Sequence, residues 1–307
     1  MLNFVFQTLK MPIRILTQVI LFSAIAIATT AQPKAADYAA EIKAWDASRI
    51  STLKSANGWV NLAGLFWLKP GENRFGSAEG NELAFKHALF PDLLGKFILT
   101  DKEVIWETAT GQEVFEKGNR VTRLVQFKLD SMQSSQLAYK TFRWTVIKRG
   151  DLVGIRFRDL AHPHLSTFNH IKRYPADSKW RVEARLEPSM IPSVAITNVL
   201  GQTSMQNSPG KVVFELQGKT YKLDAVDEGD DNLFILFGDD TNDVETYPTG
   251  RFMYIPKPDA NGQTVIDFNK AFNPPCAFSA FATCPIPPKQ NVLPLKVTAG
   301  EQKVHLD

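Results

Sequence analysis

Short stretches that alternate between apolar and polar residues, separated by turn residues, recur along most of this chain. Two pairs of such stretches are adjacent: Arg143–Lys148 with Leu152–Phe157 around Gly150, and Val212–Leu216 with Tyr221–Ala225 around Gly218. A glycine between two alternating runs is typical of a β-hairpin, because glycine accepts the positive φ angle that a tight turn needs. Roughly fourteen such runs, with turn signals about every 8 to 12 residues, predict a sandwich or a barrel-like sheet.

One segment has helical periodicity instead. Asp37 can cap a helix in which Tyr38, Ile42 and Trp45 share a face, and this helix is expected to end near Leu53. The sequence therefore predicts a mainly β fold with a short N-terminal helix. The irregular segment Arg158–Pro175 divides the strands into two expected lobes, residues 37–170 with the helix and residues 171–307, unless both form one continuous domain.

The N-terminus has the pattern of a signal peptide. Lys10 and Arg14 precede the apolar run Ile15–Ala28, and small residues follow up to Ala31. An apolar run of about 14 residues is short for a membrane span, which needs roughly 20. We predict that residues 1–31 are removed, that the mature chain has no membrane span, and that it reaches the periplasm or the extracellular space. An uncleaved anchor is the alternative.

Composition adds two constraints. The chain has 307 residues and 21 Phe, and aromatic residues favour strands, where rings pack across a pleated surface. The formal charge of +3 falls to +1 without residues 1–31, because Lys10 and Arg14 leave with no acidic residue. No basic stripe is present, so nucleic acid is not an expected partner.

Cys276 and Cys284 are the two cysteines of the chain. In an oxidising compartment they can form a disulfide that closes a small loop, and two small buried thiols are the alternative. Two thiols without a nearby His do not complete a zinc site. No cofactor is expected.

The last third of the chain carries a long motif. It reads E-T-Y-x-x-G-R-F from Glu245, D-F-N-x-A-x-N-P-P-C-A-F from Asp267 and A-T-C-P-x-P-P from Ala282. These strings resemble the signature of a widespread bacterial family of unknown function. The resemblance implies no activity and assigns no catalytic residue.

The chemistry of the motif residues indicates a polar site. Arg251 can bind an anionic or carboxylate group through its planar guanidinium, and Glu245 or Asp267 can act as acid or base. Tyr247, Asn269 and Asn273 would orient the ligand. The alternative is a structural ion pair between Arg251 and a carboxylate, with the asparagines bonded to backbone groups.

Two further sets of residues are candidates. Arg156 and Arg158 project from one face of a predicted strand and can complete an anion-binding cleft, or they can pair with surface carboxylates. His162 and His164 are candidate metal ligands, although the intervening proline makes ordinary loop polarity the alternative, and no metal is expected. The run from Asp227 to Asp231 is predicted to be a solvated acidic turn.

The sequence therefore predicts an exported β protein of unknown molecular function that binds a small polar or anionic ligand. The cleft is expected near Arg251, Glu245, Asp267 and Asn269. One alternative is a metal-independent hydrolase with Glu245 or Asp267 as the acid/base group. The other is a structural or assembly module whose proline-rich loop covers a sheet edge. The sequence does not identify a protein partner.

Overall fold

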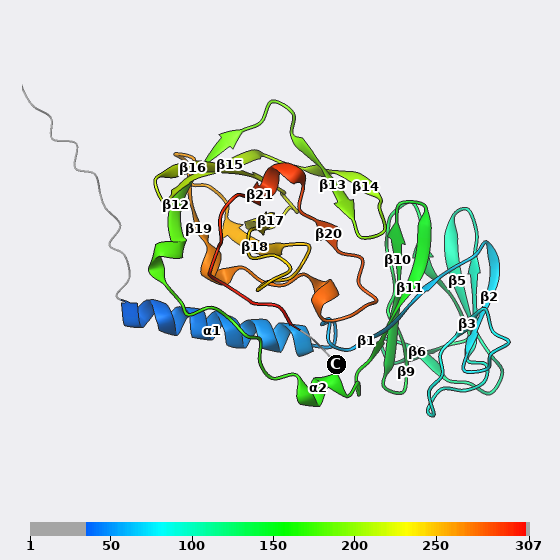
Figure 1. Ribbon diagram of the computed structural model, residues 1–307. Helices are drawn as coiled ribbons and strands as arrows, with labels where there is room; N and C mark the ends of the chain where they lie inside the picture. The colour runs from blue at the N-terminus through cyan, green and yellow to red at the C-terminus, as the bar shows by residue number, and fades with distance from the viewer. Residues whose placement is uncertain (1–34, 305–307) are drawn as a thin grey trace, which may run out of the picture. The chain divides into compact units, whose positions relative to one another are not determined.

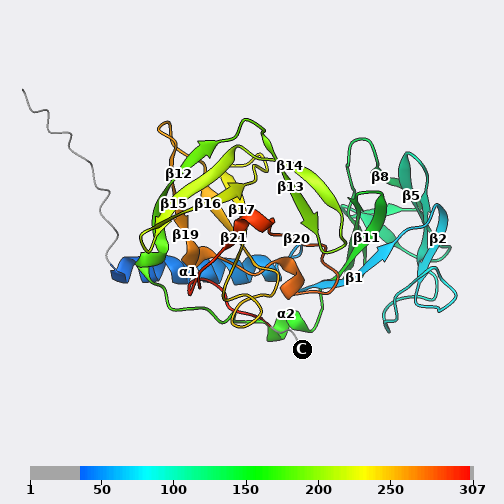
Figure 2. The same cartoon turned by 45° about the horizontal axis from the view of Figure 1, so that its top comes forward.

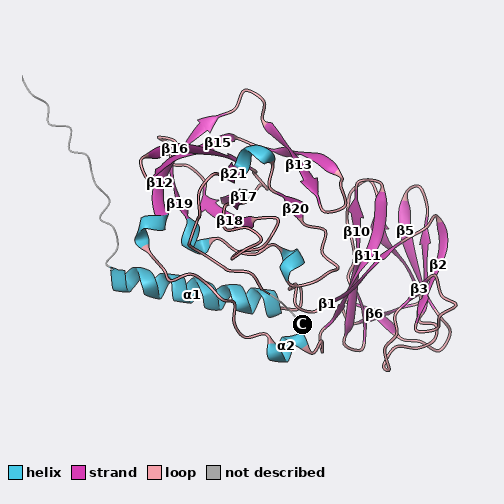
Figure 3. Cartoon of the chain, in the orientation of Figure 1, coloured by secondary structure: helices cyan, strands magenta, loops and turns pink. Residues whose placement is uncertain are grey.

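A computed structural model of the chain describes residues 35–304 (Figure 1). The predicted signal peptide lies outside these residues. Strands dominate the described part of the chain, and Figure 3 shows them together with a long helix at the start. The prediction of a mainly β fold with an N-terminal helix is confirmed, and no sheet of the described residues closes into a barrel.

Two sheets share the first hydrophobic core. One has the order β1 (Leu62–Trp67), β11 (Leu152–Asp159), β10 (Phe142–Arg149), β9 (Leu137–Tyr139), β6 (Val114–Glu116), β7 (Asn119–Val121). The other has the order β3 (Leu83–Ala84), β2 (Gly71–Gly76), β4 (Gly95–Leu99), β5 (Glu103–Thr108), β8 (Arg123–Lys128). Large aromatic side chains from both sheets, among them Phe75, Trp106 and Trp144, are fully buried between them. This part is a sandwich with an aromatic core.

Three smaller sheets follow in the sequence. Their orders are β16 (Lys219–Ala225), β15 (Gly210–Leu216), β12 (Arg181–Pro188), β19 (Gln263–Asp267); β14 (Thr203–Asn207), β13 (Ser193–Asn198), β20 (Pro285–Ile286); and β18 (Arg251–Pro256), β17 (Asn232–Asp239), β21 (Val292–Leu293). Apolar side chains of β12, β15, β17 and β18 form a second core, which includes Phe214, Ile235 and Met253. The apolar run at Leu233–Phe237 is a central strand, as its continuous hydrophobicity predicts.

The remaining elements are helical. They are α1 (Ala35–Lys54), α2 (His164–Thr167), η1 (Ser178–Trp180), η2 (Phe268–Lys270), η3 (Pro275–Ala277) and η4 (Lys289–Asn291). Tyr38 and Ile42 face inward from α1, as their spacing predicts. The Tyr38 hydroxyl donates to Asp267, and Arg49 pairs with Glu301, so α1 contacts the last third of the chain. The proposed division between residues 170 and 171 stays a prediction.

Both predicted hairpins are present. β10 pairs with β11 and β15 with β16 in antiparallel register, and Gly150 and Gly218 have φ angles of +55° and +74° at the two turns. Cys276 and Cys284 form a disulfide, which confirms the first of the two alternatives for these cysteines. It connects η3 to the residue before β20. Within residues 35–304, no helix has the length and apolarity needed to cross a membrane.

Candidate functional site

Arg251 begins β18 and is wholly buried. Its Nη2 lies 2.7 Å from the Asp239 carboxylate and 2.9 Å from the Val297 carbonyl, and its Nη1 donates to the Ala299 carbonyl. The guanidinium also lies 5.3 Å from the centre of the Phe237 ring. These contacts support the structural alternative, with Asp239 as the paired acid. A ligand-binding role for Arg251 stays a prediction.

Asp267 and Asn269 attach α1 to the second core. The Tyr38 hydroxyl donates to Asp267 Oδ1 at 2.7 Å, and Asn269 Nδ2 donates to the Tyr38 oxygen at 2.8 Å. Burial, followed by the contact with Asp267, raises the pKa of Tyr38. Asn269 is almost completely buried and donates a further bond to the Asp177 carbonyl. The two residues hold the helix in place through a buried polar network.

Asn273 lies in a second buried network. Its backbone N–H donates to Glu301 Oε2 at 2.7 Å, and its side chain donates to the Gln302 carbonyl at 2.8 Å. Burial raises the pKa of Glu301, whereas Arg49, 3.2 Å from the other carboxylate oxygen, acts in the opposite direction. This network connects α1 to the final described segment.

Glu245 and Tyr247 lie in the loop between β17 and β18. Glu245 accepts a hydrogen bond from the Tyr174 hydroxyl at 2.7 Å and lies 3.6 Å from Lys296. Burial and this hydrogen bond raise the pKa of Tyr174 to about 12. Burial also raises the pKa of Tyr247. Glu245 therefore has partners distinct from those of Asp267, and the hydrolase alternative stays a prediction.

Arg156 and Arg158 both project from the face of β11 that is turned away from the aromatic core. The Arg156 guanidinium lies 4.9 Å from the centre of the Trp59 ring, and Arg158 donates to Asn61 Oδ1 at 2.8 Å. Burial lowers the pKa of Arg156 to about 10, with Arg149 and Arg158 contributing, and burial lowers that of Arg158 to about 10. Neither arginine forms an ion pair with any residue in the range 35–304. The alternative that they pair with surface carboxylates therefore lacks a partner in the described chain.

Further arginines lie on the same face of the neighbouring strand β10. The residues on it are Arg143, Thr145, Ile147 and Arg149 from β10, and Leu152, Gly154, Arg156 and Arg158 from β11. The opposite face carries Trp144, Val146 and Ile155, which are in the core. The outward face of the hairpin therefore has four arginines and no acidic residue.

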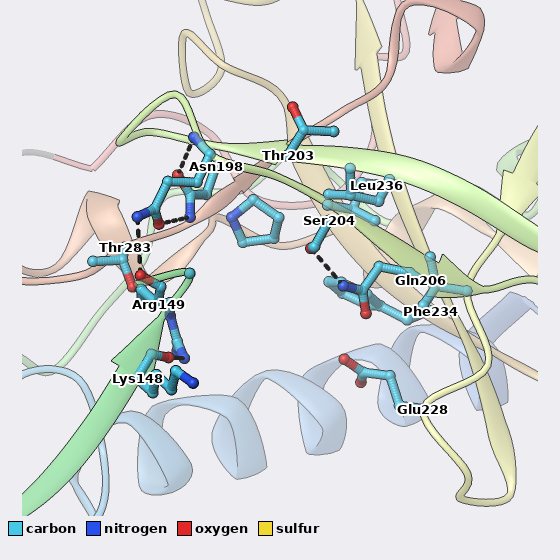
Figure 4. Close-up of a pocket in the computed structure, with 15 residues that line it drawn as sticks. Lys148, Arg149, Asn198, Thr203, Ser204, Gln206, Glu228, Phe234, Leu236 and Thr283 are labelled. Atoms are coloured by element: carbon cyan, nitrogen blue, oxygen red, sulfur yellow. Dashed lines mark hydrogen bonds between the residues drawn. The ribbon is translucent and has the colours of Figure 1, made fainter. Parts of the chain in front are cut away.

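Beside the end of this hairpin lies a pocket of about 340 Å³ (Figure 4). Lys148 and Arg149 line it from β10, Asn198 and Ser204 from β13 and β14, and Phe234 from β17. Figures 1 and 2 show the β13–β14 hairpin next to β10 and β11. Two further hollows, of about 370 and 530 Å³, have one lysine each and no arginine. Lys148 lines the larger of these hollows as well, so among the three pockets the one at Arg149 differs by its arginine and its polar side chains.

Hydrogen bonds hold Arg149 at the edge of this pocket. Its Nε donates to Thr283 Oγ1 at 3.0 Å, and its carbonyl accepts from Gln202 Nε2 at 2.9 Å. Asn198 Nδ2 in turn donates to Gln202 Oε1 at 3.0 Å. Burial lowers the pKa of Arg149. A Cβ atom at Gly150 would lie 3.1 Å from Gln202 Nε2, so glycine provides space here as well as the turn.

The histidine pair is less organised. The rings of His162 and His164 lie 4.8 Å apart, and burial, with a contribution from His164, lowers the pKa of His162. Across residues 35–304, no three His, Cys, Asp or Glu side chains are grouped so as to hold a metal ion. A metal-binding role for the two histidines stays a prediction.

The sequence reasoning did not select the residues around the pocket. Arg149 comes directly after the predicted strand Arg143–Lys148, and Glu228 lies in the stretch assigned to an acidic turn. Gln202 belongs to no motif, and Thr283 belongs to the A-T-C-P-x-P-P string but was given no role. One signal was present in the sequence. Alternate positions along both strands of the hairpin place arginines opposite the core residues and place no acid among them.

Comparisons with known proteins find a family of unknown function in the second half of the chain. Residues 166–302 match the family described as "Protein of unknown function (DUF1684)", so the chain contains a domain of that family. An uncharacterized protein from gene locus rrnAC0354 of Haloarcula marismortui, solved by solution NMR, is 30% identical; the match covers 45% of this chain and 78% of that one, with a TM-score of 0.38. No curated protein matches.

Proposed function

We propose that this is an exported protein that binds a small polar or anionic ligand in the pocket beside Arg149. One observation carries the proposal. Lys148 and Arg149 line the pocket, and neither has a carboxylate partner within ion-pairing distance in the described part of the chain. This assigns the predicted ligand class to a site other than the one around Arg251.

The energetics favour an anion at this position. A guanidinium stays charged at neutral pH even where burial makes the charge unfavourable. Burial, and then the charges of Arg149 and Arg158, lower the pKa of Arg156, and no acid on their face of the hairpin offsets these cations. A carboxylate or sulfate group held by Arg149 would supply the missing counter-charge through charge-assisted hydrogen bonds.

Titration calorimetry and thermal unfolding test this proposal. The probes are acetate, succinate, sulfate and phosphate, with sorbitol as a neutral polar probe. We expect at least one probe to bind and to raise the melting temperature, and we expect Arg149→Gln to weaken its binding about tenfold, because one charged hydrogen bond contributes roughly 1.5 to 3 kcal/mol.

Arg143→Gln is the matched control. Arg143 lies on the same face of β10 but donates to the carbonyls of Lys140 and Phe142 and does not line the pocket. Its replacement should leave binding unchanged. If no probe binds, or if both variants bind as the wild type does, the proposal is wrong.

Export has its own test. The pattern of Lys10, Arg14 and the apolar run supports cleavage after Ala31. Mass spectrometry of the chain recovered from the periplasmic and extracellular fractions should find a mature protein that begins at Gln32. A full-length chain in the cytoplasmic fraction alone would contradict export.

A further inference from the structure

Charges of opposite sign line opposite sides of the pocket. In Figure 4, Lys148, Arg149 and Thr283 lie on one side, and Gln206 and Glu228 lie on the other. Glu228 is the one acidic residue that lines the pocket. The arrangement therefore provides hydrogen-bond donors at one end and acceptors at the other.

Glu228 has no cationic partner among residues 35–304. Its Oε2 accepts a hydrogen bond from the Tyr254 hydroxyl at 3.2 Å. Its neighbour Asp227, by contrast, lies 3.0 Å from Lys257, and Asp227 Oδ1 also accepts from the Gly229 N–H. The acidic turn thus has one residue in a structural ion pair and another, Glu228, that lines the pocket without a cationic partner in the described chain.

The two charged sides do not neutralise each other. Neither Lys148 nor Arg149 comes within ion-pairing distance of Glu228 in the described chain, although all three line one pocket. Apolar side chains also line the pocket: Ile196, Val226, Phe234 and Leu236. A ligand that spans the pocket meets a cationic end, apolar side chains and an anionic end.

We propose that the ligand is a small zwitterion of the amino-carboxylate class, such as a free amino acid or a dipeptide. Its carboxylate binds at Arg149 and Lys148, its ammonium group binds at Glu228, and its apolar part lies against Phe234. The proposal rests on the proposed function and specifies its ligand class. A volume of about 340 Å³ is at the lower end of the range for small-molecule sites, which is about 300 to 1,000 Å³, and so fits a ligand of this size.

The test uses probes with matched side chains. L-leucine and glycyl-leucine are the zwitterions, N-acetyl-leucine carries the carboxylate alone, and leucinamide carries the ammonium group alone. In titration calorimetry on the mature chain, we expect a zwitterion to bind about tenfold more tightly than N-acetyl-leucine. Loss of one charge-assisted contact at 1.5 to 3 kcal/mol accounts for this ratio or a larger one.

Variants assign each end of the ligand. Glu228→Gln should abolish the preference for the zwitterion while it leaves binding of N-acetyl-leucine unchanged, and Arg149→Gln should weaken both. Asp231→Asn is the matched control, because Asp231 lies in the same exposed turn but does not line the pocket.

The outcomes separate the two proposals. If N-acetyl-leucine or another simple anion binds as tightly as the zwitterions, and Glu228→Gln changes nothing, the zwitterion inference is overturned and anion binding at Arg149 stands. If no anion and no zwitterion binds, the proposed function itself is overturned.

Discussion

The Arg251 guanidinium and the Asp239 carboxylate form an ion pair with 2.7 Å between Nη2 and Oδ2, and both side chains are completely excluded from solvent. Asp239 Oδ1 accepts additional bonds from the Thr241 and Val297 backbone N–H groups. The pair joins the end of β17, the start of β18 and the C-terminal segment. Removal of one partner would leave the other charged and buried, which is strongly unfavourable.

Replacement of Arg251 should therefore act on stability. For Arg251→Met we expect a loss of about 3 to 5 kcal/mol in the free energy of unfolding, measured in urea, because Asp239 loses its counter-ion. The double variant with Asp239→Asn should lose less, since no buried charge remains. Ligand affinity at the Arg149 pocket should stay unchanged. A folded Arg251→Met protein with wild-type stability that no longer binds ligand would restore Arg251 as a binding residue.

Arg156 should behave in the opposite way. It is half-buried, stacked on Trp59 and without a carboxylate partner in the described chain, so Arg156→Met should be neutral or stabilising by about 1 kcal/mol at low salt. The stabilisation of the protein by added sulfate should also decrease. Arg123→Met is the contrast, since Arg123 lies 2.8 Å from Glu107 and its loss should destabilise by up to about 1 kcal/mol. Equal destabilisation by Arg156→Met and Arg123→Met would contradict the conclusion that Arg156 has no carboxylate partner in the described chain.

The Cys276–Cys284 disulfide should contribute to stability and to binding. The two residues are 8 positions apart, and the chain-entropy relation gives about 2.5 kcal/mol for a loop of this length. Thr283, which holds Arg149 Nε, is adjacent to Cys284, so the variant with both cysteines replaced by serine should also bind ligand more weakly. Dithiothreitol should reproduce both effects in the wild type and have none on the variant. Undiminished affinity after reduction would show that the loop holds Arg149 without the bond.

The raised pKa of Tyr174 predicts that the free energy of unfolding depends on pH in the alkaline range. Its folded-state pKa is raised from 10 to about 12, so its contribution to stability is complete below pH 10 and is lost as the pH rises through 12. We expect Tyr174→Phe to lower the free energy of unfolding by about 1 kcal/mol at pH 8, with the difference from wild type shrinking above pH 10. Urea unfolding of both proteins across this pH range measures the difference in the free energy of unfolding.

Glu245→Gln provides the control for Tyr174. It keeps a hydrogen-bond acceptor for Tyr174 but removes the negative charge that disfavours the phenolate. The pKa of Tyr174, followed by phenolate absorbance against Tyr174→Phe, should therefore fall below that of the wild type. An unchanged titration in this variant would assign the shift to burial alone.

The hairpins show why much of the fold could be predicted. At Arg143–Phe157, alternation assigned one face to the core and a glycine marked the turn, and both are local properties of the chain. The same alternation places the four arginines on the opposite face of the hairpin, so this cationic face could also be predicted from the sequence. The attachment of α1 to Asp267 and Glu301 could not be predicted from the sequence, because these contacts join residues more than 200 positions apart.

The candidate site around Arg251 shows the limit of the same reasoning. Arg251, Asp267, Asn269 and Asn273 are close in sequence and chemically suited to a ligand, yet each has buried protein partners. Motif chemistry cannot distinguish a group that binds a ligand from one that satisfies the backbone, because both functions use the same side chains. Burial favours the structural role for these side chains, and burial depends on the whole fold.

The sequence alone therefore determined the strand-rich class, the helix at Asp37, the turns at Gly150 and Gly218 and the proximity that allows Cys276 to meet Cys284, since each depends on residues near one another in the chain. Tertiary structure decided that Arg251 pairs with Asp239 and that Arg149 lines a pocket with Thr283 and Glu228. The physical reason is that exposure and counter-charge are properties of neighbours in space, and the neighbours of Arg149 come from strands and loops far apart in sequence.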